Sequence, residues 1–148
     1  MWTSTKLTNV QKRGFCITCH TRKHKNTDLI RSLINFENTS IENVAETLPD
    51  LMTKDPALKE SRFIEKKEDG ALIYYLRFDI PIPFVTDRDM VWLSKWEKMP
   101  DGTTFYSSQS TEHADAPLVP KVERYLYWSG IVLKQNDSNV SYQSYEFM

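Results

Sequence analysis

The stretch Ile80-Pro-Ile-Pro-Phe-Val-Thr-Asp-Arg-Asp-Met-Val-Trp92 joins two segments with the character of β-strands. Before it, residues 71–80 place one set of apolar side chains on a single face, because side chains alternate along a strand. That face carries Leu72, Tyr74, Leu76, Phe78 and Ile80. After it, residues 90–98 form the next predicted strand. We expect the face of Tyr74 and Leu76 to point into the core.

An opening hairpin is predicted near the N-terminus. Residues 14–20 and 29–36 are rich in β-forming residues, and the polar run 21–26 between them is typical of a turn. We therefore expect these two segments to pair as neighbouring strands.

A short amphipathic helix is predicted after this hairpin. The segment Thr39-Ser-Ile-Glu42 has the spacing of a capping box, in which the first residue caps the helix. Apolar residues then recur at helical intervals as far as Leu48. Pro49 is expected to end the helix, because proline commonly follows a helical segment.

Further strands are predicted at residues 58–66, 103–110, 122–133 and 140–147. With the segments above, they give about eight strands and one helix. Strands at near-regular spacing with short turns are typical of an antiparallel meander. The sequence therefore predicts an α+β fold in a single domain over residues 1–148, with 40% hydrophobic residues to form its core.

The bulk composition excludes several classes of protein. With a net charge of −1, the chain lacks the overall positive charge that is typical of nucleic-acid-binding proteins. No stretch approaches the ~20 apolar residues that a membrane-spanning helix requires. The first 27 residues are nevertheless locally basic, with Lys6, Lys12, Arg13, Arg22, Lys23 and Lys25. We expect a cytoplasmic protein that does not bind nucleic acid.

One motif suggests a cofactor. Cys16-Ile-Thr-Cys19-His20 fits the C-x-x-C-H pattern of covalent haem attachment. Residues three apart on a strand point to opposite faces, so these two thiols could neither clasp a haem nor share a zinc ion. The remaining histidines are scattered, and four glycines leave no phosphate-binding loop. We expect no catalytic residues, no metal site and no cofactor, and hence no enzyme.

Aromatic residues are concentrated on the predicted strands. They are Tyr74, Tyr75, Trp92, Trp96, Tyr106, Tyr125, Tyr127 and Trp128. They can pack a core, or they can line an apolar cavity in which tyrosine and tryptophan add polar groups and cation–π contacts. Composition alone leaves both interpretations open.

The stretch 80–92 resembles the signature of the START (StAR-related lipid-transfer) domain family, in which a Pro-x-Pro element and a short loop precede Arg-Asp and a strand. The order of hairpin, capped helix and Tyr74-Tyr75 strand, followed later by Ser129-Gly-Ile-Val132, is that of the family over nearly the whole chain. With Tyr74-Tyr75 before the Pro-x-Pro element and Arg88-Asp89 after it, the chain resembles phosphatidylcholine-transfer-like members. The resemblance implies a helix-grip fold, in which a curved antiparallel sheet wraps a long C-terminal helix and one phospholipid or sterol lies between them.

The resemblance also implies candidate binding residues. Arg88 and Asp89 match the family's Arg-Asp pair, which could be an ion pair that fixes the loop or a contact to a lipid headgroup. Met90 and Trp92 match pocket-facing positions, and strand alternation and the register of the Ser-Gly-Ile-Val match supply the others. The predicted lipid-binding residues are Tyr74, Leu76, Phe78, Arg88, Met90, Trp92, Leu126 and Trp128.

The chain departs from the family pattern in two places. After the first helix the family often has Arg-Lys-x-Trp-Asp, whereas this chain has Leu51-Met-Thr-Lys-Asp55, so that Lys54 is the available cation in place of the usual phosphate-binding arginine. The sequence reaches Met148 without the long C-terminal helix. We therefore expect a C-terminally truncated START-like domain with the C-terminal helix missing and one apolar sheet face uncovered.

Two functions remain open. The first is non-catalytic binding of a lipid, with its transfer between membranes or its sensing, where residues 111–121 act as a mobile gate and the basic N-terminal residues touch an anionic membrane transiently. The alternative is a regulatory or interaction module, whose uncovered sheet docks a partner helix or a second copy of the chain.

Overall fold

A single antiparallel sheet dominates the computed structural model, which describes residues 10–12, 15–24 and 27–147. Its strand order is β1-β2-β3-β10-β9-β7-β6-β5-β4, and β8 pairs in parallel with β6 off this path. The elements are β1 (Val10–Lys12), β2 (Phe15–His24), β3 (Thr27–Phe36), α1 (Ile41–Thr53), β4 (Leu58–Lys66), β5 (Leu72–Phe78), β6 (Asp87–Lys98), β7 (Thr104–Ser110), β8 (Val122–Arg124), β9 (Trp128–Asn136) and β10 (Asn139–Phe147).

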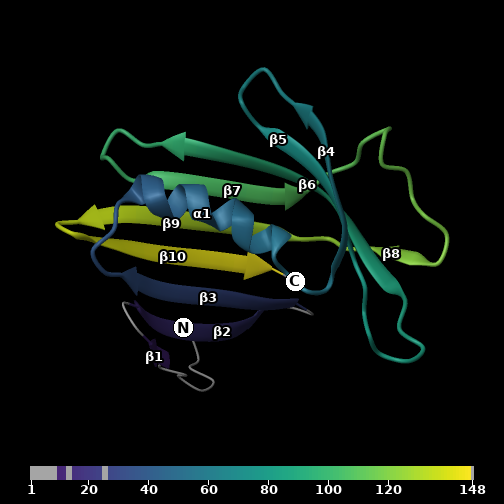
Figure 1. The fold of residues 1–148 in the computed structure, drawn as a ribbon, viewed down its shortest axis with the longest axis horizontal. Coiled ribbons are helices and arrows are strands. Elements are labelled where there is room, and N and C mark those ends of the chain that lie inside the picture. Colours follow the sequence, from purple (N-terminus) through teal and green to yellow (C-terminus); the bar gives the residue numbers. More distant parts are fainter. Residues whose placement is uncertain (1–9, 13–14, 25–26, 148) are drawn as a thin grey trace.

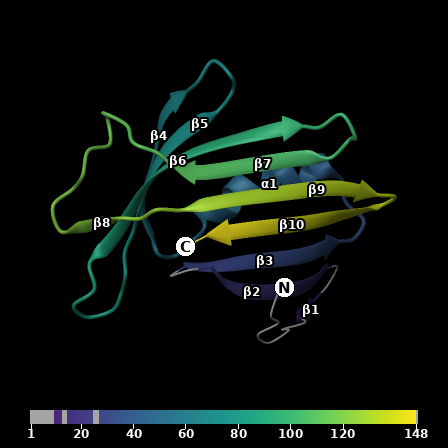
Figure 2. The ribbon, with the colours of Figure 1, turned by 180° about the vertical axis from the view of Figure 1, so that it is seen from behind.

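The sheet is strongly curved, and α1 lies over its concave face. Figure 1 shows α1 in front of β9 and β10, while β4 and β5 cross the view steeply at one end of these strands. Figure 2 shows the same strands from behind, with α1 on their far side. The predicted α+β fold with one helix after the second strand of the opening hairpin is therefore confirmed. Among the described residues α1 is the only helix, so the long C-terminal helix is absent from them, as expected.

The start of α1 is fixed by two polar side chains. Ser40 Oγ accepts a hydrogen bond of 3.2 Å from the backbone N–H of Asn43, which makes Ser40 the N-cap. From the β9–β10 hairpin, Gln135 accepts from the N–H of Ile41 at 3.1 Å and donates to the carbonyl of Thr39 at 3.1 Å. The cap predicted at Thr39 is therefore wrong by one residue.

The largest differences between predicted and observed boundaries occur in three places. The helix continues through Pro49 to Thr53, about one turn further than predicted. Strand β2 ends at His24 and β3 begins at Thr27. Most of the polar run 21–26 therefore belongs to the hairpin strands and not to a turn. The single strand predicted at residues 122–133 is divided into β8 and β9.

A buried apolar cluster attaches α1 to the sheet. Ile41 and Val44 from the helix pack against Ile131, Leu133 and Val140 from β9 and β10. Leu133 and Val140 have no exposed surface. This cluster holds the helix over the concave face and so fixes one wall of the space beneath it.

Both faces of β5 and β6 are buried. Sequence alternation placed Ile73 and Tyr75 on the outer face of β5, yet they are only 2% and 4% exposed. The reason is that residues 111–117 fold back over the convex face, where Ala116 packs with Ile73, Tyr75 and Val91.

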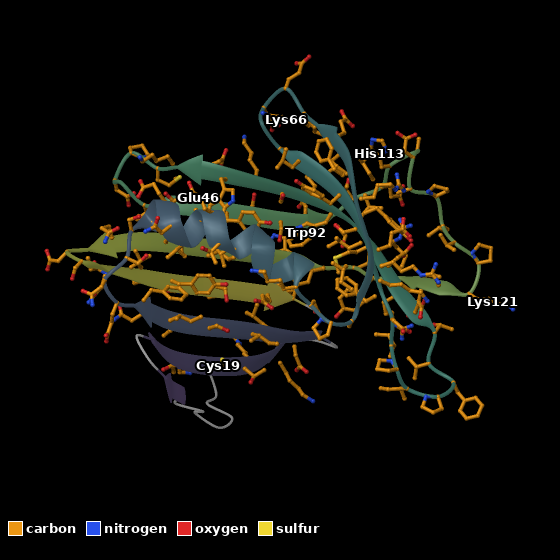
Figure 3. All side chains as sticks on the ribbon, in the orientation of Figure 1. Cys19, Glu46, Lys66, Trp92, His113 and Lys121 are labelled. Atoms are coloured by element: carbon orange, nitrogen blue, oxygen red, sulfur yellow. The ribbon has the colours of Figure 1, made fainter. Side chains whose placement is uncertain are left out.

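The segment 111–121 is anchored along its first half. The N–H of Thr111 donates to the carbonyl of Val91 at 2.9 Å, and Arg62 donates to the carbonyl of Asp115 at 3.0 Å. His113 Nε2 lies 2.9 Å from Glu65 Oε2, at the position labelled in Figure 3. Residues 111–116 thus lie on the convex face, whereas the gate proposed for residues 117–121 stays a prediction.

Candidate functional site

The concave face encloses a cavity of about 470 Å³ beside α1. This volume lies within the range of about 300–1,000 Å³ that is usual for small-molecule sites. Most of the lining comes from β5, β6, β7, β9 and β10. The lining residues are Leu48, Ser61, Gly70, Leu72, Tyr74, Leu76, Trp92, Ser94, Lys95, Trp96, Tyr106, Ser108, Tyr127, Ser129, Ile131, Tyr142 and Glu146.

A row of polar side chains crosses the floor of the cavity. Ser94 on β6 lies opposite Ser108 on β7, Ser108 lies opposite Ser129 on β9, and Ser129 lies opposite Glu146 on β10. Residues directly opposite each other on paired strands share one face of the sheet. Ser94, Ser108, Ser129 and Glu146, named the polar row below, therefore all point into the same space.

Aromatic rings form the walls on both sides of the polar row. Trp96 and Tyr106 have ring centroids 4.6 Å apart, and Trp92 meets Tyr127 edge to face at 6.2 Å. Burial raises the pKa of Tyr106 to about 12 and also raises the pKa of Tyr127. At neutral pH these phenols remain uncharged, so the walls are apolar surfaces with hydroxyl groups.

Two charged residues reach the cavity. Lys95 Nζ is paired with Glu97 Oε1 at 2.9 Å and with Asp69 Oδ2 at 3.4 Å. At the end of the polar row, burial raises the pKa of the Glu146 carboxyl, and the nearby Ser144 hydroxyl opposes this rise. The charged groups of the lining are thus one lysine that two carboxylates neutralise and one carboxyl that burial pushes towards its neutral form.

Two buried polar atoms of the cavity have no hydrogen-bond partner among the described residues. They are Trp92 Nε1 and Ser108 Oγ, in side chains that are 9% and 1% exposed. An unsatisfied buried polar group costs about 1–3 kcal/mol, so such groups usually have a partner. Figure 3 places Trp92 between α1 and the crossing of β5 with β6.

Five of the predicted residues lie at or directly behind the cavity wall. Tyr74, Leu76 and Trp92 line the cavity. Phe78 and Met90 do not line it, but they pack against Leu76 and Trp92 in one cluster. The alternation predicted for β5 and the start of β6 therefore gives the correct face.

Arg88 and Asp89 lie away from the cavity and do not pair with each other. Arg88 Nη1 pairs with Glu123 Oε2 at 2.7 Å. Asp89 accepts two hydrogen bonds from Arg124, at 2.7 and 3.1 Å, and one from the hydroxyl of Tyr75 at 3.1 Å. Adjacent residues on a strand point to opposite faces, so an ion pair between these two neighbours was a wrong expectation. The structure also contradicts the placement of Arg88 at the cavity.

Leu126 and Trp128 are 76% and 39% exposed, and their predicted inward register is wrong. The predicted strand is interrupted between β8 and β9. There, Ser110 Oγ accepts a hydrogen bond from the N–H of Tyr127 at 2.6 Å and lies 3.2 Å from the carbonyl oxygen of Tyr125. β9 then takes its register from β7, where Ser108 already faces inward. The cavity is consequently lined by Tyr127, Ser129 and Ile131.

Sequence reasoning missed the polar row. Ser94 lies two residues after Trp92 on β6, so alternation along that strand could have found it. Ser108, Ser129 and Glu146 depend on the pairing of distant strands and had no local signal. Lys54, the cation considered for a phosphate, is exposed and is not part of the lining.

Two further features of the described residues bear on function. They contain no group of three or more His, Cys, Asp or Glu side chains arranged to hold a metal ion. Their helix is too short or too polar to cross a membrane. Cys19 lies on β2, with its Sγ 3.6 Å from Ser32 Oγ.

The model of the START domain family matches residues 10–145. Among solved structures, a STAR-related lipid transfer protein from Xanthomonas axonopodis has a TM-score of 0.75 at 18% identity, over 99% of this chain and 80% of that one. Human STARD10 has a TM-score of 0.76 at 16% identity, over 96% of this chain and 59% of its own. The lipid transfer and protein localization domain of human StarD13 has a TM-score of 0.75 at 18% identity, over 99% and 74%.

At these low identities the TM-scores show a shared fold alone, and the chain spans less than two thirds of the STARD10 structure. No curated protein sequence matches the chain. The family match covers almost the whole chain and includes the strands that line the cavity, except for the last two residues of β10, of which Glu146 is one. The chain therefore belongs to the START domain family.

Proposed function

We propose that the protein binds one lipid molecule in the cavity beside α1 and carries it between membranes or senses it, without catalysis, in the cytoplasm. The observation that supports this most directly is the aromatic cavity of about 470 Å³ with a buried polar row. Membership of the START family and the likeness to solved lipid transfer proteins support lipid binding in general. A phospholipid and a sterol are both compatible with these comparisons.

A carrier function fits the chemistry of the lining. Its polar groups are mainly serine and tyrosine hydroxyls, and it contains no histidine or cysteine. Of its two charged residues, Lys95 is paired with two carboxylates and Glu146 lies at the end of the polar row. The His113 ring instead pairs with Glu65 on the convex side of the sheet. General acid–base or nucleophilic catalysis needs such groups within hydrogen-bonding reach of each other in the site.

The Trp92→Ala variant is expected to lose lipid transfer by about 10-fold or more, because it removes a buried aromatic wall that would contact the ligand. The measurement is transfer of labelled lipid between vesicles, with mass spectrometry of the lipid that copurifies. Trp128→Ala is the matched control, since Trp128 is 39% exposed and lies outside the cavity. Unchanged transfer and unchanged bound lipid in Trp92→Ala would exclude this site.

Membrane contact is proposed at a pair of apolar loops. In the loop between β5 and β6, Ile82 is 58% exposed and Phe84 is fully exposed, and Leu118 in the neighbouring loop is 74% exposed. The parallel pairing of Asp87 with Val122 places the ends of these two loops side by side. Exposed apolar side chains grouped in this way are typical of membrane or protein contacts.

The basic N-terminal residues remain a second proposal for membrane contact. Lys6, Arg13 and Lys25 lie outside the described residues. Arg22 and Lys23 are exposed on β2, where they could meet an anionic surface.

The Phe84→Gly variant is expected to bind vesicles several-fold more weakly while keeping its stability. Phe84 has a φ of 67°, in the left-handed region that glycine adopts without steric strain. Vesicle cosedimentation and urea unfolding measure the two effects. Met99→Gly is the control, because Met99 is 44% exposed in the turn at the other end of β6. Equal vesicle binding by wild type and Phe84→Gly would contradict the loop assignment.

A further inference from the structure

The two unpartnered polar atoms of the cavity are neighbours in the sheet. Ser94 lies directly opposite Ser108, and Trp92 precedes Ser94 by two residues, so that all three share the cavity face. Trp92 and Ser108 are therefore diagonal neighbours on adjacent strands, a separation that long side chains can bridge. One end of a ligand in the cavity can meet both groups.

The chemistry of these two atoms limits the ligand group that could satisfy them. An indole N–H only donates, whereas a serine hydroxyl donates or accepts. The ligand group must therefore offer an oxygen that accepts from Trp92. A hydroxyl, ester carbonyl or amide carbonyl oxygen meets this requirement, and an ammonium group does not.

The charges of the lining disfavour an anionic headgroup. Lys95, the cation of the lining, already has Glu97 and Asp69 as partners. The polar row ends in the Glu146 carboxyl, which would repel a phosphate whenever it is ionised. Arg88, whose guanidinium pairs with the Glu123 carboxylate, lies outside the lining. A buried anion needs a paired cation, so a neutral headgroup fits this cavity better.

We infer that the preferred ligand is a neutral lipid with a hydroxyl group, and that Trp92 and Ser108 hold its oxygen at the polar row. This inference rests on the proposed function, because it names the class of lipid that the same cavity selects. Ser94 and Ser129 lie opposite Ser108 on either side, and Tyr106 precedes Ser108 by two residues on β7, so their hydroxyls can extend the hydrogen-bond network to a second oxygen of the ligand.

Competition between lipids tests the inference. Purified protein is equilibrated with vesicles that contain equal amounts of cholesterol, dioleoylglycerol and dioleoylphosphatidylcholine, and the bound lipid is quantified by mass spectrometry. Wild type is expected to retain cholesterol or dioleoylglycerol in preference to the phospholipid. Trp92→Phe, which keeps an aromatic ring but removes the N–H, and Ser108→Ala, which removes only the hydroxyl, are each expected to weaken binding of that lipid by about 5-fold.

Ser107→Ala is the matched control, because Ser107 is the neighbour of Ser108 on the opposite face of β7. The two test variants lie on different strands, so that misfolding of one leaves the other informative. Preferential retention of dioleoylphosphatidylcholine would overturn the inference and leave lipid binding intact. Retention of a hydroxylated lipid that neither variant weakens would also overturn it. Binding of no lipid by the folded protein would instead overturn the proposed function.

Discussion

The Asp89→Ala variant is expected to lose about 3–5 kcal/mol of unfolding free energy, because it leaves a largely buried guanidinium without its counter-ion. Asp89 is 1% exposed and accepts hydrogen bonds from Arg124 and Tyr75. The Arg124 side chain is 15% exposed and also donates to the carbonyls of Ala116 and Pro117. Loss of the carboxylate therefore weakens the attachment of the 111–121 segment as well as the pair itself.

Urea unfolding followed by circular dichroism measures this loss. A domain typically has about 5–15 kcal/mol of total stability, so this loss should move the midpoint of unfolding to a much lower urea concentration. Arg88→Ala is the control on the adjacent residue. Its pair with Glu123 is partly exposed, with side chains 29% and 66% exposed, so its removal should cost no more than about 1 kcal/mol. Similar losses in the two variants would show that the Asp89 cluster does not hold the convex face together.

The second large effect is expected from Leu133→Ala, which should lower the unfolding free energy by about 2–5 kcal/mol. Leu133 has no exposed surface and packs with Ile41, Val44 and Val140. Truncation leaves a void beneath α1, and the surrounding side chains can fill it only in part.

Thermal and urea unfolding give the size of this loss. Leu118→Ala removes the same atoms from a side chain that is 74% exposed, and its effect should remain within about 0.5 kcal/mol. Because Leu48 on α1 lines the cavity, Leu133→Ala should also weaken lipid retention. A variant as stable as Leu118→Ala would show that α1 does not depend on this cluster.

The strand alternation of β5 was predictable because it is local. Tyr74 and Leu76 lie in an unbroken strand, and their spacing alone gives the face that meets the cavity. The bounds of β4, Leu58–Lys66, also agree with the prediction, since polar turn residues mark its end.

The errors share a different cause, which is contact between distant parts of the chain. Asp89 pairs with Arg124, 35 residues further along the chain, and not with its neighbour Arg88. Tyr75 is buried because a later segment covers it. The polar row requires the register of four strands at once, and neither alternation nor composition contains that information.

The break between β8 and β9 has a consequence for how ligand preference could change in evolution. Three residues separate Arg124 from Trp128, and the hydroxyl of Ser110 bridges this gap. If deletion of one of these three residues made β9 slip by one position against β7, the two faces of β9 would be exchanged, because the side-chain period of a strand is two. Trp128, Gly130 and Val132 would then take the cavity positions of Tyr127, Ser129 and Ile131. A change in the length of one short connection, without any substitution, could thus remove the hydroxyl groups of Tyr127 and Ser129 from the cavity while those on the other strands remain.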